Sequence, residues 1–190
     1  MAGLTFRKRK KRVNYQLVKE GIVWIAELIF VFALACILVI NFGVMISNVG
    51  QSMEPTLASG DRVLTNRLIY KMTEPKRGEL IVFKPNGNEN SHYYIKRVIG
   101  LPGERIQIID GFIYINGEVL VEEIKLEKMK YAGIAEEELK LGDGEFFVLG
   151  DNRNASEDSR NAEIGVIKMQ DITAKAWFDA TPGEHFGKIE

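Results

Sequence analysis

The chain has 190 residues, enough for one domain and an accessory segment but too few for two full domains. Hydrophobic residues make up 46% and charged residues 27%, which is typical of a protein that folds around a core. One cysteine and two histidines argue against a disulfide framework and against a zinc site built from several histidines. No metal or cofactor is therefore expected in the protein's chemistry.

The first predicted element is a membrane-spanning helix over residues 21–47. Residues 22–45 read IVWIAELIFVFALACILVINFGVM, an almost unbroken apolar run. At about 1.5 Å per residue this helix is about 35 Å long, enough to cross a hydrocarbon core of about 30 Å. A cleaved signal peptide has an apolar core of only about 7 to 15 residues. A lipoprotein cleavage site at Cys36 is also disfavoured, because apolar residues continue well beyond it. Both observations favour a permanent anchor.

Residues 1–20 are predicted to form a basic tail on the cytoplasmic side. They hold one acid, Glu20, and seven basic residues: Arg7, Lys8, Arg9, Lys10, Lys11, Arg12 and Lys19. Short basic flanks of a membrane span stay in the cytoplasm. A nucleic-acid-binding tail is the alternative, but the adjacent span favours an orientation signal in contact with the lipid bilayer. We therefore expect a single-pass protein of the cytoplasmic membrane, with no nucleic-acid partner and with residues 48–190 outside the cytoplasm.

Residues 48–190 are predicted to form one mainly β domain. Tight-turn dipeptides at Asp110-Gly111 and Asn116-Gly117 predict a β-meander over 104–122, inside a small β-rich lobe over 104–145. Residues 127–141 have a more helical or irregular pattern, and 151–163 form a polar loop. Runs of β-branched and aromatic residues predict strands at 62–70, 79–84, 93–100, 105–110, 112–117, 118–126 and 145–150.

Three polar segments contain residue types that could carry chemistry. The first is GQSMEPTL at 50–57, which presents Ser52 between a glycine and a proline and in isolation is as typical of an ordinary turn. The second is YIKRVIGLPGE at 94–104, where alternation along a strand puts Lys96 and Arg97 on opposite faces. The third is GDNRNASEDSR at 150–160, which is either a solvated loop or a rigid network of arginines and carboxylates.

Lys96 has two interpretations. It is either a lysine on an edge strand that extends its amine into water, or a buried lysine whose pKa falls from about 10.4 to about 8. In the second case the neutral amine can accept a proton from a serine hydroxyl.

Together these segments resemble the type I signal peptidases, membrane-bound serine endopeptidases that use a serine/lysine dyad. The resemblance rests on four blocks in the family's order after an amino-terminal span: GQSMEPTL, RGELIVFK at 77–84, YIKRVIGLPGE and GDNRNASEDSR. The short stretch between Lys96 and Gly150 is similar to the compact single-span form of Gram-positive bacteria. The resemblance implies a signal-peptidase-like β domain that removes N-terminal signal peptides from exported preproteins with small residues at −1 and −3 of the cleavage site.

The resemblance also implies roles for particular residues. Ser52 matches the nucleophile and Lys96 the general base. Ser156 matches a hydroxyl that orients the lysine amine. The other matched positions are the pair Asp158 and Arg160 that holds the site, Gly150 and Asn152 that shape the loop, and Met53, Ile95 and Tyr94 at the substrate-binding surface.

One position departs from the family pattern. Many members have a serine two positions before the nucleophile, where its hydroxyl helps to stabilise the oxyanion, and this chain has Gly50 there. Loss of an oxyanion donor costs about 10²–10³ in rate, so a backbone group or a water is expected to replace it.

Three other functions compete with this interpretation. His92 allows a Ser52–His92–Asp158 triad, although its neighbours NGNENS predict a surface loop. A self-cleaving repressor-type peptidase shares the serine/lysine logic but has no membrane span. A catalytically silent, membrane-tethered β-module would leave Ser52 and Lys96 unreactive.

Overall fold

A computed structural model describes residues 14–42, 44–87, 92–122, 124, 126–183 and 185–189. The chain divides into two units, Met1–Val39 and Ile40–Glu190. The basic residues at positions 7–12 of the expected cytoplasmic tail lie outside the described residues.

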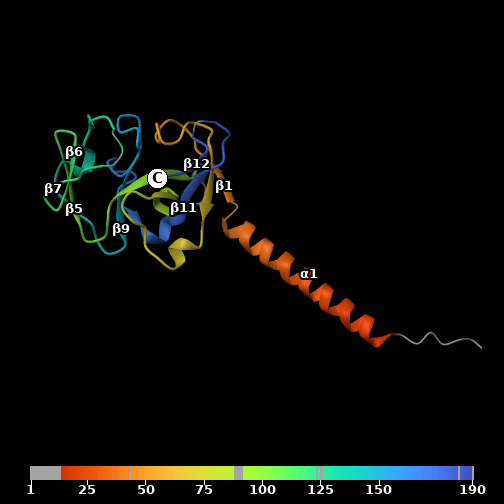
Figure 1. Ribbon diagram of the computed structural model, residues 1–190. Helices are drawn as coiled ribbons and strands as arrows, with labels where there is room; N and C mark the ends of the chain where they lie inside the picture. The colour runs from red at the N-terminus through yellow and green to blue at the C-terminus, as the bar shows by residue number, and fades with distance from the viewer. Residues whose placement is uncertain are drawn as a thin grey trace, which may run out of the picture. The chain divides into compact units, whose positions relative to one another are not determined.

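Helix α1, Tyr15–Phe42, accounts for nearly all of the described part of the first unit and extends three residues into the second (Figure 1). Its stretch Tyr15–Ile40 is long and apolar enough to cross a membrane. The apolar side chains along it are exposed; those of Leu28, Phe30 and Phe32 are 68%, 68% and 72% exposed. The helix is a candidate membrane span.

The helix boundaries differ from the predicted span over 21–47. The helix begins six residues earlier, because Tyr15–Glu20 contains no helix breaker. It ends at Phe42, and Val44–Ser47 forms strand β1 instead. These four residues alternate in burial and pair with β2, so the sheet takes residues that apolarity alone assigned to the helix.

The second unit contains a large antiparallel sheet in the order β1-β2-β11-β3-β4-β9-β10, with β12 paired to β11. Strand β4 lies between β3 and β9, with Lys96 opposite Ile81 and Arg97 opposite Leu149. Because β4 is internal, Lys96 does not lie on an edge strand. The strands of this sheet are β1 (Val44–Ser47), β2 (Arg62–Asn66), β3 (Leu80–Phe83), β4 (Tyr94–Gly100), β9 (Glu145–Leu149), β10 (Ile167–Lys168), β11 (Ile172–Asp179) and β12 (Gly187–Lys188).

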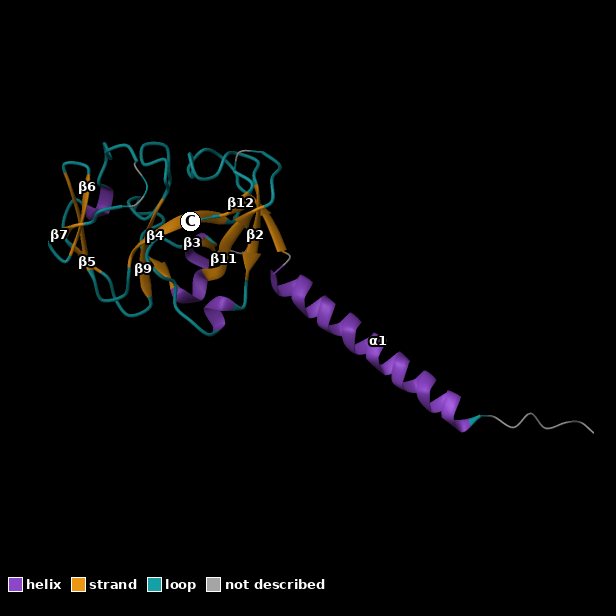
Figure 2. Cartoon of the chain, in the orientation of Figure 1, coloured by secondary structure: helices purple, strands orange, loops and turns teal. Residues whose placement is uncertain are grey.

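A smaller sheet in the order β7-β6-β5-β8 occupies most of residues 104–145. Its strands are β5 (Arg105–Ile109), β6 (Phe112–Ile115), β7 (Glu118–Val119) and β8 (Leu139–Lys140). The β5–β6 turn holds Asp110 and Gly111 at φ 52° and 79°, as its Asp-Gly dipeptide requires. Beyond the end of α1, helical structure in the described part of the second unit is limited to 3-10 turns at Ile69–Lys71, Pro85–Gly87, Gly133–Ala135 and Met169–Asp171 (Figure 2).

Two predicted strands are much shorter than expected, and five strands, β1, β8, β10, β11 and β12, were not predicted. The strand at 62–70 stops at Asn66, because the Asn66 side chain accepts the N–H groups of Leu68 and Ile69 and forms a turn. The strand at 118–126 stops at Val119, and Glu122 pairs with Arg153 of the polar loop instead. Strand β11, the longest of the unpredicted strands, lies between β2 and β3, although its segment ITAKAWFD contains four residues of weak strand preference.

Two apolar clusters position the candidate site. One joins the two sheets by packing Ile99, Phe147 and Leu149 against Ile106 and Ile113. The other packs Met53 and Leu57, which follow Ser52, against strands of the large sheet; its strand members are Val63, Leu80, Val82, Ile95, Ala174 and Ala176.

Candidate active site

Ser52 lies on a loop, residues 48–61, that is fastened at both ends. The N–H of Asn48 donates to the carbonyl of Asp61 at 2.8 Å, and the N–H of Gly60 donates back to the Asn48 carbonyl at 2.8 Å. The buried Asn48 amide also donates to the Ala58 carbonyl at 2.9 Å. This Ser52 loop is therefore closed by its own backbone and anchored to the sheet by its apolar side chains.

The side chains of Ser52 and Lys96 meet beside β4. Lys96 Nζ and Ser52 Oγ are 2.5 Å apart, and Lys96 is only 3% exposed. Burial lowers the pKa of Lys96 to about 8, and it outweighs the carboxylates of Asp158 and Glu157, which raise that pKa. No carboxylate among the described residues forms an ion pair with the amine. The geometry therefore joins a hydroxyl to an amine that can be neutral near physiological pH.

Arg97 organises a second network that the sequence analysis did not find. Its guanidinium binds both oxygens of Asp151, at 2.8 Å and 2.7 Å, and donates to the Gly78 carbonyl at 2.7 Å. Thr56 of the Ser52 loop donates to the same carboxylate at 2.5 Å. The ion pair is buried and ties β4, the Ser52 loop and the start of the polar loop together. The alternation of side chains along a strand predicted that Arg97 and Lys96 lie on opposite faces. No sequence pattern indicated that Arg97 pairs with a carboxylate 54 positions away.

The polar loop, residues 150–160, is fixed by a second buried ion pair. Arg160 binds both oxygens of Asp158 at 2.8 Å, and the N–H of Gly150 donates to Asp158 at 3.1 Å. The N–H of Asn152 donates to the Ser52 carbonyl at 3.1 Å, so Asn152 acts through its backbone.

Gly150 permits the close approach of the polar loop to Ser52. A Cβ at this position would lie 2.4 Å from the Ser52 carbonyl oxygen and would also overlap the Ser156 hydroxyl. Any side chain would therefore push the two loops apart.

Ser156 does not make the bond that the resemblance implied. Its hydroxyl is buried and has no hydrogen-bond partner in the part of the chain that the structure describes. It lies beside Gly150, close to the dyad, but the Lys96 amine donates to Ser52 instead.

A groove of about 260 Å³ runs past the dyad between two chain segments, 48–52 and 92–96. Gly50, Tyr94 and Ile95 line it, whereas Met53 is fully buried in the core beneath the loop. The expectation that Met53 lines a substrate pocket therefore does not match its position. His92 lines the groove as an exposed residue, and the Ser52 hydroxyl contacts Lys96.

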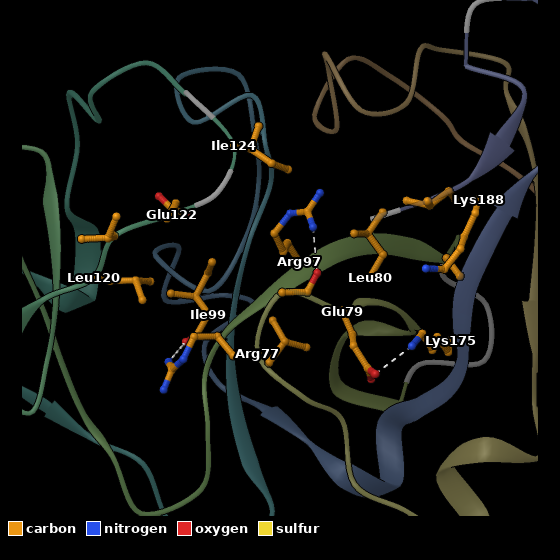
Figure 3. Close-up of a pocket in the computed structure, with 15 residues that line it drawn as sticks. Arg77, Glu79, Leu80, Arg97, Ile99, Leu120, Glu122, Ile124, Lys175 and Lys188 are labelled. Carbon is orange, nitrogen blue, oxygen red and sulfur yellow. Dashed lines mark hydrogen bonds and ion pairs between the residues drawn. The ribbon is translucent and has the colours of Figure 1, made fainter.

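A larger cleft of about 640 Å³ contains neither dyad residue (Figure 3). Arg77, Glu79, Arg97 and Lys175 line it, and Glu79 pairs with Lys175 at 2.7 Å. Its charged groups are engaged in ion pairs and hydrogen bonds, so the smaller groove is the better candidate for chemistry.

Comparison with known proteins assigns the chain to a family. Residues 22–180 match the family described as signal peptidase, peptidase S26. The signal peptidase I of Bacillus licheniformis is 34% identical over 148 residues, which cover 74% of this chain and 78% of that protein. The signal peptidase I T of Bacillus subtilis is 37% identical over 136 residues, covering 68% and 69%. A crystal structure of a signal peptidase I from Enterococcus faecalis is 32% identical and covers 55% of this chain and 97% of that one, with a TM-score of 0.44.

The match covers most of the candidate span and all of the Ser52 loop, β4 and the polar loop, so it includes all of the segments that form the site. The chain belongs to the signal peptidase family, peptidase S26.

Proposed function

We propose that this protein is a signal peptidase I that removes N-terminal signal peptides from exported preproteins by acyl transfer, with Ser52 as nucleophile and Lys96 as general base. The observation that carries the proposal is the 2.5 Å contact between Lys96 Nζ and Ser52 Oγ inside a buried site. Family membership supports the substrate class, and the lowered pKa of Lys96 supports the assignment of the base.

In the proposed reaction, neutral Lys96 takes the proton of the Ser52 hydroxyl as the oxygen attacks the scissile carbonyl. The protonated amine then gives that proton to the leaving nitrogen of the mature protein. A water molecule, deprotonated by Lys96 in turn, attacks the acyl-enzyme and releases the signal peptide with a free carboxylate. Asp158 and Arg160 hold the polar loop in place during both steps.

The oxyanion would be stabilised first by the backbone N–H of Ser52. This N–H donates to no acceptor among the described residues, so it is available to a substrate. The N–H of Gly50 is engaged with the Ser59 hydroxyl at 3.3 Å. With no side-chain hydroxyl at position 50, a water or a second backbone N–H completes the oxyanion site in this proposal.

The substrate would bind as an extended strand in the groove. Strand β9 pairs with β4 only from Arg97 onward, so the backbone of Tyr94 to Lys96 has no β9 partner on that side. An extended peptide can add to such an edge, with alternate side chains directed into the groove. We expect small residues at −1 and −3 of the cleavage site to lie beside Ile95, which is buried and lines the groove.

The proposed orientation places the amino terminus in the cytoplasm and the catalytic domain outside, with lipid around α1. Ser52 follows Phe42 by ten residues, a link that spans at most about 36 Å when extended. A nucleophile tethered this closely to a span suits substrates whose apolar signal segment is still in the bilayer.

The test compares alanine variants of Ser52, Lys96 and His92 in a preprotein cleavage assay, together with covalent labelling by a serine-acylating β-lactam or lipopeptide. Loss of cleavage and labelling in Ser52→Ala and Lys96→Ala, with His92→Ala still active, is the expected pattern. An inactive His92→Ala beside an active Lys96→Ala would replace the dyad with a triad. An unlabelled wild-type protein would instead favour the silent β-module.

A further inference from the structure

A second group of chemically active side chains lies at the turn that closes the Ser52 loop. Asp61, Asp179 and His185 each present one ligand atom, and these atoms lie within 4.8 Å of one another. Asp61 ends the Ser52 loop, Asp179 ends β11, and His185 lies just before β12. Three segments distant in sequence thus bring two carboxylates and an imidazole together.

The Asp179 carboxylate is buried and only partly hydrogen-bonded. The residue is fully buried, and its Oδ1 accepts the N–H of Thr181 at 2.8 Å. Its Oδ2 is buried and has no hydrogen-bond partner among the described residues. A buried carboxylate oxygen without a partner is strongly unfavourable, because the lost hydration is not replaced.

Asp61 brings a second carboxylate to the same place. Its side chain is 9% exposed, and its Oδ2 accepts the N–H of Ala58 at 2.6 Å. Within the described ranges, neither carboxylate pairs with a lysine or arginine; the imidazole of His185 is the basic group beside them. One imidazole can balance at most one of these two buried carboxylates, so the cluster keeps uncompensated negative charge that a cation would neutralise.

We propose that Asp61, Asp179 and His185 bind a divalent transition-metal ion of the zinc class. His185 Nδ1 and Asp61 Oδ2 are 3.3 Å apart, which matches the roughly 3.3 Å between ligand atoms that each lie about 2.0–2.1 Å from a tetrahedral Zn²⁺. Imidazole and carboxylate ligands suit zinc, whereas Ca²⁺ takes about 6 to 8 oxygens and Mg²⁺ keeps most of its waters. His185 is 38% exposed, so the ion has an entry route and a fourth position open to water.

The ion would act as a structural crosslink and would take no part in acyl transfer. It would join the β11–β12 connection to the turn at 58–61, and Asp61 already closes the Ser52 loop through its backbone. The two ion pairs of the polar loop restrain Ser52 through the contacts of that loop. The proposed metal site would restrain the end of the Ser52 loop itself.

The experiment uses the full chain in detergent micelles, purified without a polyhistidine tag and stripped of metal with a chelator. Zn²⁺ is then titrated while bound metal and Tm are measured. The expected results are one Zn²⁺ per chain and a Tm about 5–10 °C higher at a free Zn²⁺ concentration about 100 times the Kd. His185→Ala and Asp179→Asn are expected to abolish both the binding and the shift. His92→Ala removes the chain's other histidine and is expected to keep both.

Two further variants keep the result interpretable. Asp179→Asn removes a buried charge, so its metal-free form is expected to be at least as stable as the metal-free wild type; a lost zinc response then cannot reflect misfolding. Ser52→Ala is expected to bind Zn²⁺ like the wild type, so the outcome does not depend on the proposed acyl transfer. The proposal is overturned if the stripped protein binds no Zn²⁺, or if His185→Ala retains the full Tm shift. It is equally overturned if the Tm of the metal-free protein changes with pH but does not change when Zn²⁺ is added.

Discussion

Lys96 and Arg97 are adjacent residues of one strand, both are buried, and they meet opposite electrostatic surroundings. Arg97 binds both oxygens of Asp151 and a backbone carbonyl, so its charge is matched. Lys96 has the Ser52 hydroxyl at 2.5 Å and no carboxylate in ion-pair contact among the described residues. A carboxylate thus balances the charge of Arg97, whereas no carboxylate forms an ion pair with its neighbour Lys96 among the described residues.

The difference explains which of the two can perform proton transfer. A guanidinium stays protonated at any accessible pH, so it suits a permanent buried ion pair. An ammonium without a paired carboxylate loses its proton more easily when buried, and the pKa of Lys96 falls to about 8 for this reason. We therefore propose that the Arg97 side of β4 provides rigidity and that the Lys96 side provides the chemistry.

Lys96→Met should abolish catalysis while sparing the fold. Without a base, kcat/KM for a preprotein peptide is expected to fall by at least about 10⁴-fold. The free energy of unfolding should stay level or rise, because an apolar side chain replaces a buried amine. Peptide cleavage and urea denaturation measure the two effects. Lys175→Met is the matched control: it removes the partner of Glu79, so it should lower stability and retain cleavage. A Lys96→Met enzyme with more than about 1% activity would contradict the assignment.

Asp151→Asn should damage the fold more than the chemistry. It leaves the Arg97 guanidinium buried without its counter-charge, and breaking a buried pair in this way costs about 3–5 kcal/mol. Urea denaturation measures the loss. The double variant Arg97→Met/Asp151→Leu removes both charges and is expected to lose less stability than the single variant. If Asp151→Asn costs under about 1 kcal/mol, the Arg97 side is not the rigid half of the comparison.

Gly150→Ala should separate the two loops without touching either dyad residue. Its Cβ would fall 2.4 Å from the Ser52 carbonyl oxygen, so Ser52 must move and kcat is expected to drop about 10²-fold. Overpacking should also cost about 1–3 kcal/mol. Gly142→Ala serves as the control, since its Cβ would meet only the flexible end of Glu145. Equal kcat values for the two variants would show that the close approach at Gly150 is unimportant.

Ser156→Ala should have the smallest effect of the four. The hydroxyl has no partner in the described structure, so the free energy of unfolding should change by less than about 1 kcal/mol. If substrate binding brings the hydroxyl to the Lys96 amine, as the family resemblance implies, kcat should fall about 10-fold. Single-turnover cleavage separates this from a binding effect. An unchanged kcat would remove Ser156 from the machinery.

Runs of β-branched and aromatic residues predicted the strands β3, β4, β5, β6 and β9. They failed at β11, where Ala174, Lys175 and Ala176 have weak strand preference and the pairing with two neighbouring strands decides the structure. They also failed at Val44–Ser47, because an apolar segment next to a span is not distinguishable from the span by hydropathy.

The candidate site was predicted by motif resemblance and not by spacing. The proximity of Ser52 and Lys96 depends on how the Ser52 loop packs against β4, which no local pattern encodes. The Arg97–Asp151–Thr56 network was missed for the same reason, since three separate segments supply its members. Met53 was assigned to a substrate pocket, but it is fully buried, because an apolar residue after the nucleophile also serves to anchor the loop.

The central claim is that burial lowers the pKa of Lys96 enough for its neutral amine to act as the base, and direct titration of that amine tests it most closely. Lysine side chains labelled with ¹³C at Cε can be followed by NMR in the detergent-solubilised protein, with the Lys96 resonance identified by its absence from Lys96→Met. Burial without a paired carboxylate predicts a midpoint at about 8, and kcat/KM should rise about tenfold per pH unit below that value and level off above it. A Lys96 midpoint near the ordinary lysine value of about 10.4 would contradict the account.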